Sequence, residues 1–119
     1  MTTAHDPEAT YREFREAVNM TPAALRHWLE TDGSKSVGMT PSGESVTEPG
    51  RAESVGHHMG SRILELKQQP RADLTPDDYA DMRKVVGYVH RHTAQRPAGD
   101  IEHSRWRKSL MNWGHDPMK

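Results

Sequence analysis

The sequence predicts a single all-α domain, compact and built from about five helices. Apolar residues recur three and four positions apart in five separate segments, which is the spacing of a helix with one buried face. No segment shows the alternation of apolar and polar residues that is typical of a half-buried strand. A length of 119 residues fits one domain, and a hydrophobic fraction of 33% requires the apolar residues to gather on a few helix faces. We expect residues 7–117 to form this domain and residues 1–6 to be frayed.

The first helix is expected at residues 7–18. Tyr11, Phe14 and Val18 fall three and seven positions apart, so they share one face that can pack on the rest of the domain. Glu8 lies near the start of this helix, where the unpaired backbone amides favour a negative charge. The pattern therefore predicts a short amphipathic helix whose other positions face solvent.

A second helix is expected between Thr21-Pro22 and Asp32-Gly33. Thr is a good N-cap, and a proline at the first helical position loses a hydrogen bond that would be missing there anyway. The apolar edge of this helix consists of Leu25, Trp28 and Leu29. We expect this edge to pack on the first helix across a tight turn, with Trp28 in the core.

Residues 39–53 are expected to form a long flexible loop, because Gly, Ser, Pro, Thr and Glu replace the periodic apolar pattern there. The third helix follows at about residues 54–69, with Ser54 as its N-cap. The apolar line of this helix is Met59, Ile63 and Leu66. Gly56 and Gly60 lie one turn apart on it, and we expect them to let another backbone come close.

The fourth helix is expected at residues 75–97 and is the clearest in the sequence. Thr75 serves as its N-cap, Pro76 occupies the first helical position, and Pro97 ends it. One stripe of this helix is predicted to pack in the core, namely Tyr79, Met82, Val85, Val86, Val89 and Thr93. A second stripe is predicted to face solvent or a partner, namely Lys84, Tyr88, Arg91 and Gln95.

The fifth helix is expected to begin at Asp100 and to end at Gly114, which can supply a positive φ after the last turn. Its apolar line is Trp106, Leu110 and Trp113. The segment that follows has two interpretations. The favoured one is a helix stop, in which Trp113 is buried and His115 or Asp116 bonds freed backbone groups, because each residue then has a structural use. The other is an exposed corner of Trp113 and His115 that stacks on a base or grips a partner.

Four segments are specific enough to compare with known families: TPAALRHWLETDGSKSVG, ESVGHHMGSRILELK, DDYADMRKVVGYVHRHTAQRP and SRWRKSLMNWGHDP. Together they resemble the bacterial domain-of-unknown-function family thirty-one-forty over nearly the whole chain outside the first few residues and residues 39–52. The resemblance supports the element boundaries given above. It implies no activity, cofactor, ligand or catalytic residue, because none is established for the family. Some members carry an automatic DNA-binding label, which adds slightly to the case for nucleic acid.

The composition excludes several classes of function. The chain has no cysteine, which rules out disulfides, zinc–thiolate sites, iron–sulfur clusters and cysteine nucleophiles. No stretch approaches the roughly 20 apolar residues that span a bilayer, and the first twenty residues lack the features of a signal peptide, so we expect a cytoplasmic protein without membrane association. Charge is uneven, because residues 1–53 carry five Lys and Arg against nine Asp and Glu, a net charge of −4, and residues 54–119 carry 11 against eight, a net charge of +3.

Cationic side chains concentrate on the last two expected helices. Residues 83–108 contain seven Lys and Arg but only two carboxylates, Asp100 and Glu102. If the two helices lie side by side, their outward faces form one positive surface that can neutralise phosphates, with Arg forks reaching phosphate oxygens or guanine edges and Tyr88 stacking on a base. We call this surface the basic strip. Its candidate nucleic-acid-binding residues are Arg83, Lys84, Tyr88, Arg91, Arg96, Arg105, Arg107 and Lys108.

The eight histidines raise the question of a metal site. His90 and His92 are two positions apart, so they do not share a helix face as paired ligands would. A site assembled in three dimensions remains open, and its candidate ligands are His57, His103, His115 and Asp116. We expect no metal, because the local spacing is poor.

Two pairs contain residue types found in hydrolytic triads, Ser104 beside His103 and His115 beside Asp116. Adjacent residues cannot generally form the hydrogen bond between a nucleophile and its base, and no Gly-x-Ser-x-Gly elbow is present. We therefore expect no enzymatic activity and no cofactor.

The sequence thus predicts a small non-enzymatic binding module. The leading hypothesis is weak binding of DNA or another nucleic acid through the basic strip. An ordinary solvated helix face explains the same pattern, and it is favoured by a pI of about 6.7 and by the lack of a complete helix-turn-helix or zinc-finger signature. The alternative function is a non-catalytic protein-interaction or stress-associated module, in which the acidic first half or the loop at residues 39–53 contacts a partner.

Overall fold

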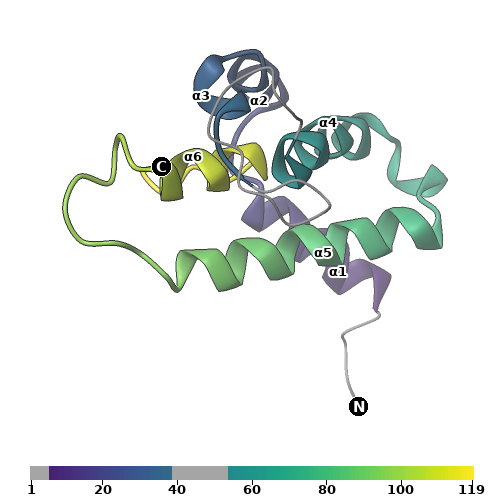
Figure 1. The fold of residues 1–119 in the computed structure, drawn as a ribbon. Helices are drawn as coiled ribbons and strands as arrows, with labels where there is room; N and C mark the ends of the chain where they lie inside the picture. Colours follow the sequence, from purple (N-terminus) through teal and green to yellow (C-terminus); the bar gives the residue numbers. More distant parts are fainter. Residues whose placement is uncertain (1–5, 39–53) are drawn as a thin grey trace.

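The computed structural model describes residues 6–38 and 54–119, and within these ranges the chain is helical and contains no strand (Figure 1). Its helices are α1 (Pro7–Ala17), α2 (Pro22–Leu29), α3 (Asp32–Lys35), α4 (Val55–Gln68), α5 (Pro76–Thr93) and α6 (Arg105–Asn112), with a 3-10 helix η1 (Arg71–Asp73) before α5. The prediction of an all-α domain is confirmed, with one α-helix more than expected. None of the described helices has the length and apolar character needed to cross a membrane. The loop predicted at residues 39–53 lies outside the described residues.

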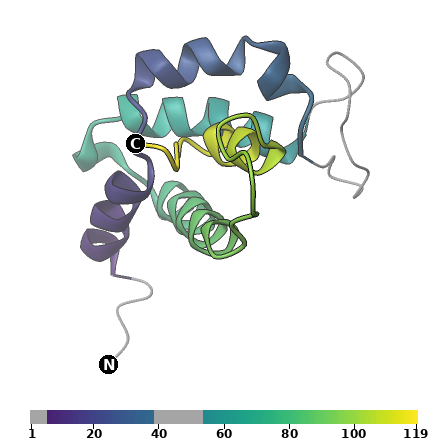
Figure 2. The same ribbon diagram turned by 90° about the vertical axis from the view of Figure 1, so that its left-hand side faces the viewer.

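The longest helix, α5, runs along one side of the molecule, and α1 packs against it (Figures 1 and 2). The middle of the molecule holds α4 and α6, which both contact α5. On the side away from α5, α2 covers α4 and α6, and α3 packs on α6. The core between these layers contains side chains from five helices, among them Phe14, Leu25, Ile63, Met82, Val85 and Leu110.

The expected packing of the second helix on the first is wrong, because α2 contacts α3, α4 and α6 while α1 contacts α5. The cause is the C-terminal segment, which pairs with the link between α1 and α2. The Met20 amide donates to the Gly114 carbonyl oxygen at 3.1 Å. Asn19 exchanges two hydrogen bonds with the backbone of Asp116, at 3.0 and 2.7 Å. These bonds hold the link against the C-terminal segment, and α2 leaves in another direction.

A side-chain oxygen caps each α-helix in the described ranges. The predicted caps are confirmed, namely Thr21, Ser54 and Thr75. Thr75 forms a reciprocal capping box with Asp78, with N–O distances of 3.2 and 2.9 Å. Asp6 is also a cap, because its carboxylate accepts from the Glu8 amide at 3.0 Å. The fraying predicted for residues 1–6 therefore does not include Asp6.

The helix that the sequence pattern missed is α3. Where Asp32 and Gly33 are expected to lead into a loop, Thr31 caps one further helical turn, and its hydroxyl accepts from the Ser34 amide at 3.2 Å. The Ser34 side chain is fully buried, and so is Val37 just after the turn. This turn therefore belongs to the packed domain.

The last two helices are shorter than predicted. α5 ends at Thr93 rather than near Pro97, because the backbone hydrogen bonds of its last turn tighten toward the three-residue spacing of a 3-10 helix. α6 begins after Ser104 rather than at Asp100, because the Ser104 hydroxyl accepts a first-turn amide at 3.1 Å. Asp100 instead closes an isolated turn with the His103 amide, at 3.3 Å.

Gly56 and Gly60 allow the close approach on α4 that the sequence predicts. A Cβ built on Gly60 would lie 2.7 Å from the Asn112 carbonyl oxygen and 2.5 Å from Cδ2 of Leu29. A Cβ built on Gly56 would lie 2.8 Å from Nε1 of Trp113. The end of α6 therefore packs directly on the backbone of α4, which only glycine permits at these distances.

The segment after α6 is a helix stop, as the favoured interpretation predicts. Trp113 is only 5% exposed, which rules out the exposed corner. Gly114 has a φ of 78°, a conformation that favours glycine at the end of a helix. Nδ1 of His115 lies 2.8 Å from the carbonyl oxygen of Ala17 in the last turn of α1. The C-terminal segment thus joins the end of α6 to the end of α1.

Candidate nucleic-acid interface

The outward side of α5 and the link after it carry half of the predicted binding residues. Lys84 and Arg91 lie two turns apart on this face and are exposed, and the half-buried Arg83 lies beside them. Arg96 follows in the link after the helix and is exposed. We refer to these four residues as the α5 cations.

The α5 cations are not neutralised by carboxylates. The sequence has no Asp or Glu between Asp81 and Asp100, and none of the four cations forms an ion pair with a residue in the described ranges. Asp81 and Asp78 on the same helix are already engaged, because Arg62 of α4 donates to them at 2.8 and 2.5 Å. Hydrogen bonds from the Thr75 amide and from Arg62 hold the pKa of Asp78 below its ordinary value.

The side chain of Arg91 extends along α5 in the direction of Lys84. Its guanidinium covers Gly87, since a Cβ built on Gly87 would lie 2.9 Å from Nη1 of Arg91. Gly87 lies between the two cations on the same face, so the missing side chain lets their charges come closer together. Lys84 also lines an open hollow of about 530 Å³ between α4 and α5, together with Met59 and Arg62.

Two residues that shape this surface, Gly87 and Arg62, are not among those that the sequence singles out. Gly87 could have been found, because it lies inside a helix and on its polar face. Glycine weakens a helix, so its presence there indicates a packing or functional role. Arg62 gives no such signal, because its pairing with carboxylates of α5 depends on how two helices pack. Its effect is to keep those carboxylates away from the α5 cations.

Tyr88 belongs to an internal stack of aromatic rings and not to the outward face. Its ring centroid lies 4.2 Å from that of Trp113 and 5.1 Å from that of His92, with interplanar angles of 12° and 15°. His92 in turn stacks on Trp106 with 6.2 Å between centroids. Burial raises the pKa of Tyr88 to about 12. The predicted role of Tyr88 is therefore corrected, because its ring is already stacked between other rings and is not free to receive a base.

Arg96 and Trp106 connect the end of α5 to α6. Nε1 of Trp106 donates to the His92 carbonyl oxygen at 2.6 Å, and Cζ of Arg96 lies 5.7 Å from the centroid of the Trp106 ring. An aromatic ring positions a guanidinium but does not cancel its charge. Arg96 therefore remains an available cation at the end of the α5 face.

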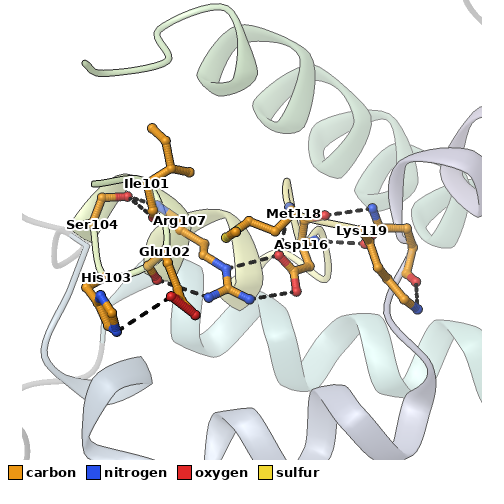
Figure 3. Close-up of polar contacts among 9 residues, drawn as sticks. Ile101, Glu102, His103, Ser104, Arg107, Asp116, Met118 and Lys119 are labelled. Carbon is orange, nitrogen blue, oxygen red and sulfur yellow. Dashed lines mark hydrogen bonds and ion pairs between the residues drawn. The ribbon is translucent and has the colours of Figure 1, made fainter. Parts of the chain in front are cut away.

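Arg107 is held within the fold (Figure 3). Its Nε and Nη2 donate to the two carboxylate oxygens of Asp116 at 3.1 and 3.0 Å, and its Nη1 donates to the Glu102 carbonyl oxygen at 3.0 Å. The side chains of this pair are 21% and 17% exposed, and Arg107 holds the pKa of Asp116 below its ordinary value. The prediction that Arg107 binds phosphate is corrected, because this bidentate pair fastens the C-terminal segment to α6.

On α6, Arg105 is exposed and Lys108 is half-buried. They share a helix face with Asn112, which hydrogen-bonds to Ser34 of α3. Trp106, which stacks toward α5, lies on a different face. That the cations of α5 and α6 form one basic strip therefore stays a prediction, and the α5 cations are the members of it that lie on one helix and its adjoining link.

We expect the stability of the folded protein to depend on pH because of His92. Nε2 of this residue is buried without a hydrogen-bond partner among the described residues. Burial lowers the pKa of His92 below its ordinary value of 6.5, and a hydrogen bond with the Trp106 backbone partly opposes this. A lowered pKa means that the unfolded chain takes up a proton that the folded chain resists, so stability is lost as the pH falls below about 6.5.

We expect the melting temperature to fall more between pH 7 and pH 5 in the unaltered protein than in His92→Phe, which keeps a stacking ring but cannot titrate. Thermal unfolding followed by circular dichroism measures both curves. The exposed His103 has its pKa raised by Asp100, which acts in the opposite direction, but it is present in both proteins and cancels in the comparison. Parallel curves would contradict the role assigned to His92.

The candidate metal ligands are dispersed. No group of three or more His, Cys, Asp or Glu suited to holding a metal occurs in residues 6–38 and 54–119. Nε2 of His57 lies 2.9 Å from the Leu29 carbonyl oxygen, while His103 bonds to Asp100 at 2.8 Å. The site considered from His57, His103, His115 and Asp116 is therefore not formed by these side chains.

Comparison with known proteins adds a family match. The family model described as "Protein of unknown function (DUF3140)" matches residues 13–111, from within α1 to within α6. The comparisons with curated proteins and with solved structures gave no significant match.

The protein-interaction alternative depends partly on residues 39–53, which lie outside the described residues.

Proposed function

We propose that this chain, which belongs to the DUF3140 family of proteins of unknown function, binds nucleic acid weakly and without sequence preference through the α5 cations. The observation that carries the proposal is a helix face and its adjoining link with four Lys and Arg that form no ion pair in the described residues. Phosphates are the ligand that such a face fits best, because they are closely spaced anions that Lys and Arg neutralise without reading the bases.

Charge alone is expected to drive this binding. The backbones of Lys84 and Arg91 are about 10 Å apart along the helix axis, and the Arg91 guanidinium lies over Gly87 between them, so the two charges can meet neighbouring phosphates of one strand. The rings nearest this face, Tyr88 and Trp106, are already packed against other rings. Single strands therefore gain nothing from stacking, and a duplex is expected to bind more tightly because its charge density is higher.

The affinity for a generic duplex is expected to fall steeply as salt is added, because each cation that meets a phosphate releases counterions. Lys84→Ala and Arg91→Ala should each reduce the slope of log affinity against log salt by about one. Fluorescence anisotropy of a labelled duplex, starting from about 50 mM salt, measures these slopes.

A matched control is Arg26→Ala, because Arg26 is exposed on α2 and its loss changes the net charge by the same amount. This variant is expected to keep the slope of the unaltered protein. Equal losses in all three variants would mean that only the overall charge matters. Such a result, or a flat titration of the unaltered protein at low salt, would contradict binding through the α5 face.

A further inference from the structure

A second group of cations gathers where the end of α1, the end of α4 and the last residue of the sequence come together. None of them is among the predicted binding residues. The group consists of Arg15 on α1, Lys67 on α4, Arg71 on η1 and Lys119. Figure 2 shows the end of the chain between α1 and the end of α4 that leads into η1. We call this group the α1–α4 corner.

Two arginines of the α1–α4 corner meet on one aromatic ring. Cζ of Arg71 lies 4.7 Å and Cζ of Arg15 lies 5.7 Å from the ring centroid of Tyr11, and Nη1 of Arg15 donates to the Tyr11 hydroxyl at 3.3 Å. Arg71 has one carboxylate nearby, Glu8, at 3.7 Å, but both side chains are well exposed, at 49% and 77%. An exposed pair at this distance contributes little stability.

Lys119 is positioned by a neutral group. Its Nζ donates to the carbonyl oxygen of Asn19 at 2.7 Å. The side chain of Asn19 is fixed in turn by the backbone of Asp116. The ammonium of Lys119 is therefore directed beside the end of α1. It forms no ion pair with a side chain in residues 6–38 and 54–119, and the carbonyl that accepts its hydrogen bond carries no full negative charge.

Lys67 lies in the last turn of α4, four positions before Arg71. Its side chain is half-buried and makes no hydrogen bond or ion pair with any residue in the described ranges. Burial lowers the pKa of Lys67, and the like charges of Arg15 and Lys119 lower it further, with no carboxylate acting against them. A partly buried ammonium beside other cations is unfavourable unless an anion joins it.

The carboxylates of α1 do not fill this role. Glu13 and Glu16 line a separate hollow of about 210 Å³ on the side of α1 that faces α5, together with His90 and His115. The corner therefore presents positive charge from four chain segments, and among the described residues the one carboxylate paired with it is the exposed Glu8 beside Arg71.

We propose that the α1–α4 corner is a binding site for a phosphate dianion, held by Lys67, Arg15 and Lys119. A dianion would place negative charge among three cations and supply acceptors to the unpartnered ammonium of Lys67. The inference does not depend on nucleic-acid binding by α5, because the two groups of cations share no residue. The ligand class is inorganic phosphate or the terminal phosphate of a small molecule.

The test compares the melting temperature of the full chain in sodium phosphate and in sodium chloride of equal ionic strength. At a phosphate concentration tenfold above the dissociation constant, a gain of about 6 °C over chloride is expected. Lys67→Gln should abolish this gain, and Lys119→Gln should reduce it. Lys84→Gln, which removes a cation from the α5 face, should keep it in full.

Three results would overturn the proposal. The first is an unaltered protein that melts at the same temperature in both salts. The second is a phosphate gain in Lys67→Gln equal to that of the unaltered protein. The third concerns the source of the phosphate. We expect Lys67→Gln to bind a generic duplex with the same affinity as the unaltered protein, and a lower affinity would count against the proposal. A loss of duplex affinity as large as that of Lys84→Ala would make the corner part of a nucleic-acid surface instead of a small-anion site.

Discussion

Asn112→Ala is expected to lower the free energy of unfolding by about 3 kcal/mol, although the change removes a single polar group. Asn112 is 1% exposed and joins α6 to α2 and α3. Nε1 of Trp28 donates to its Oδ1 at 2.8 Å, the Ser34 hydroxyl donates to the same oxygen, and its Nδ2 donates to the Ser34 carbonyl oxygen at 3.0 Å. Truncation leaves these groups without partners inside the fold. Urea unfolding followed by circular dichroism measures the loss.

A double-mutant cycle shows whether Asn112 and Ser34 act as one unit. Ser34→Ala alone is expected to cost about 1 kcal/mol, because one buried hydrogen bond is lost. The double variant should cost about as much as Asn112→Ala alone, since the hydroxyl has then already lost its acceptor. Losses that simply add would show that the two residues do not share a network.

Gly60→Ala is expected to destabilise the protein by about 2 kcal/mol, against the usual gain of alanine in a helix. The added methyl group would meet the Asn112 carbonyl oxygen at 2.7 Å and Leu29 at 2.5 Å, and the backbone oxygen cannot move aside cheaply. The helices α4 and α6 would have to separate. The same urea unfolding experiment measures the change.

Gly87→Ala is the matched control on α5. Its methyl group would meet only the end of the flexible Arg91 side chain, at 2.9 Å. This variant should therefore be unchanged or more stable by up to about 1 kcal/mol, as expected for alanine in a helix. Equal effects of the two substitutions would contradict the close contact assigned to Gly60.

Local chemistry was sufficient to predict most of the helices. Thr75 and Pro76 fix the start of α5, and the apolar spacing identifies Met82 and Val89 as core residues. The same information could not predict α3, because its four residues have no apolar period and its buried Ser34 is held by Asn112, 78 positions away. The contacts between helices could not be predicted either, because a stripe of apolar residues identifies the buried face of a helix but not the helix that covers it.

The sequence predicts which residue types the candidate site contains, but not which of them share one surface. The sequence locates the cations of α5, and the structure leaves Lys84 and Arg91 on its outward face. Tyr88 shares their spacing but lies at the border of that face, where Trp113 covers it. The pairing of Arg107 with a carboxylate nine positions away depends on how the chain turns after α6, which spacing alone does not reveal.

The central claim is that the outward face of α5 is the surface that meets phosphates. The most direct measurement is the change in amide chemical shifts of the ¹⁵N-labelled chain as a short generic duplex is added at low salt. We predict that the largest changes fall on the amides of Lys84, Gly87 and Arg91 and weaken as salt is raised, while α2 stays unaffected. Changes centred on α1 or α2, or no change at any position, would contradict the account.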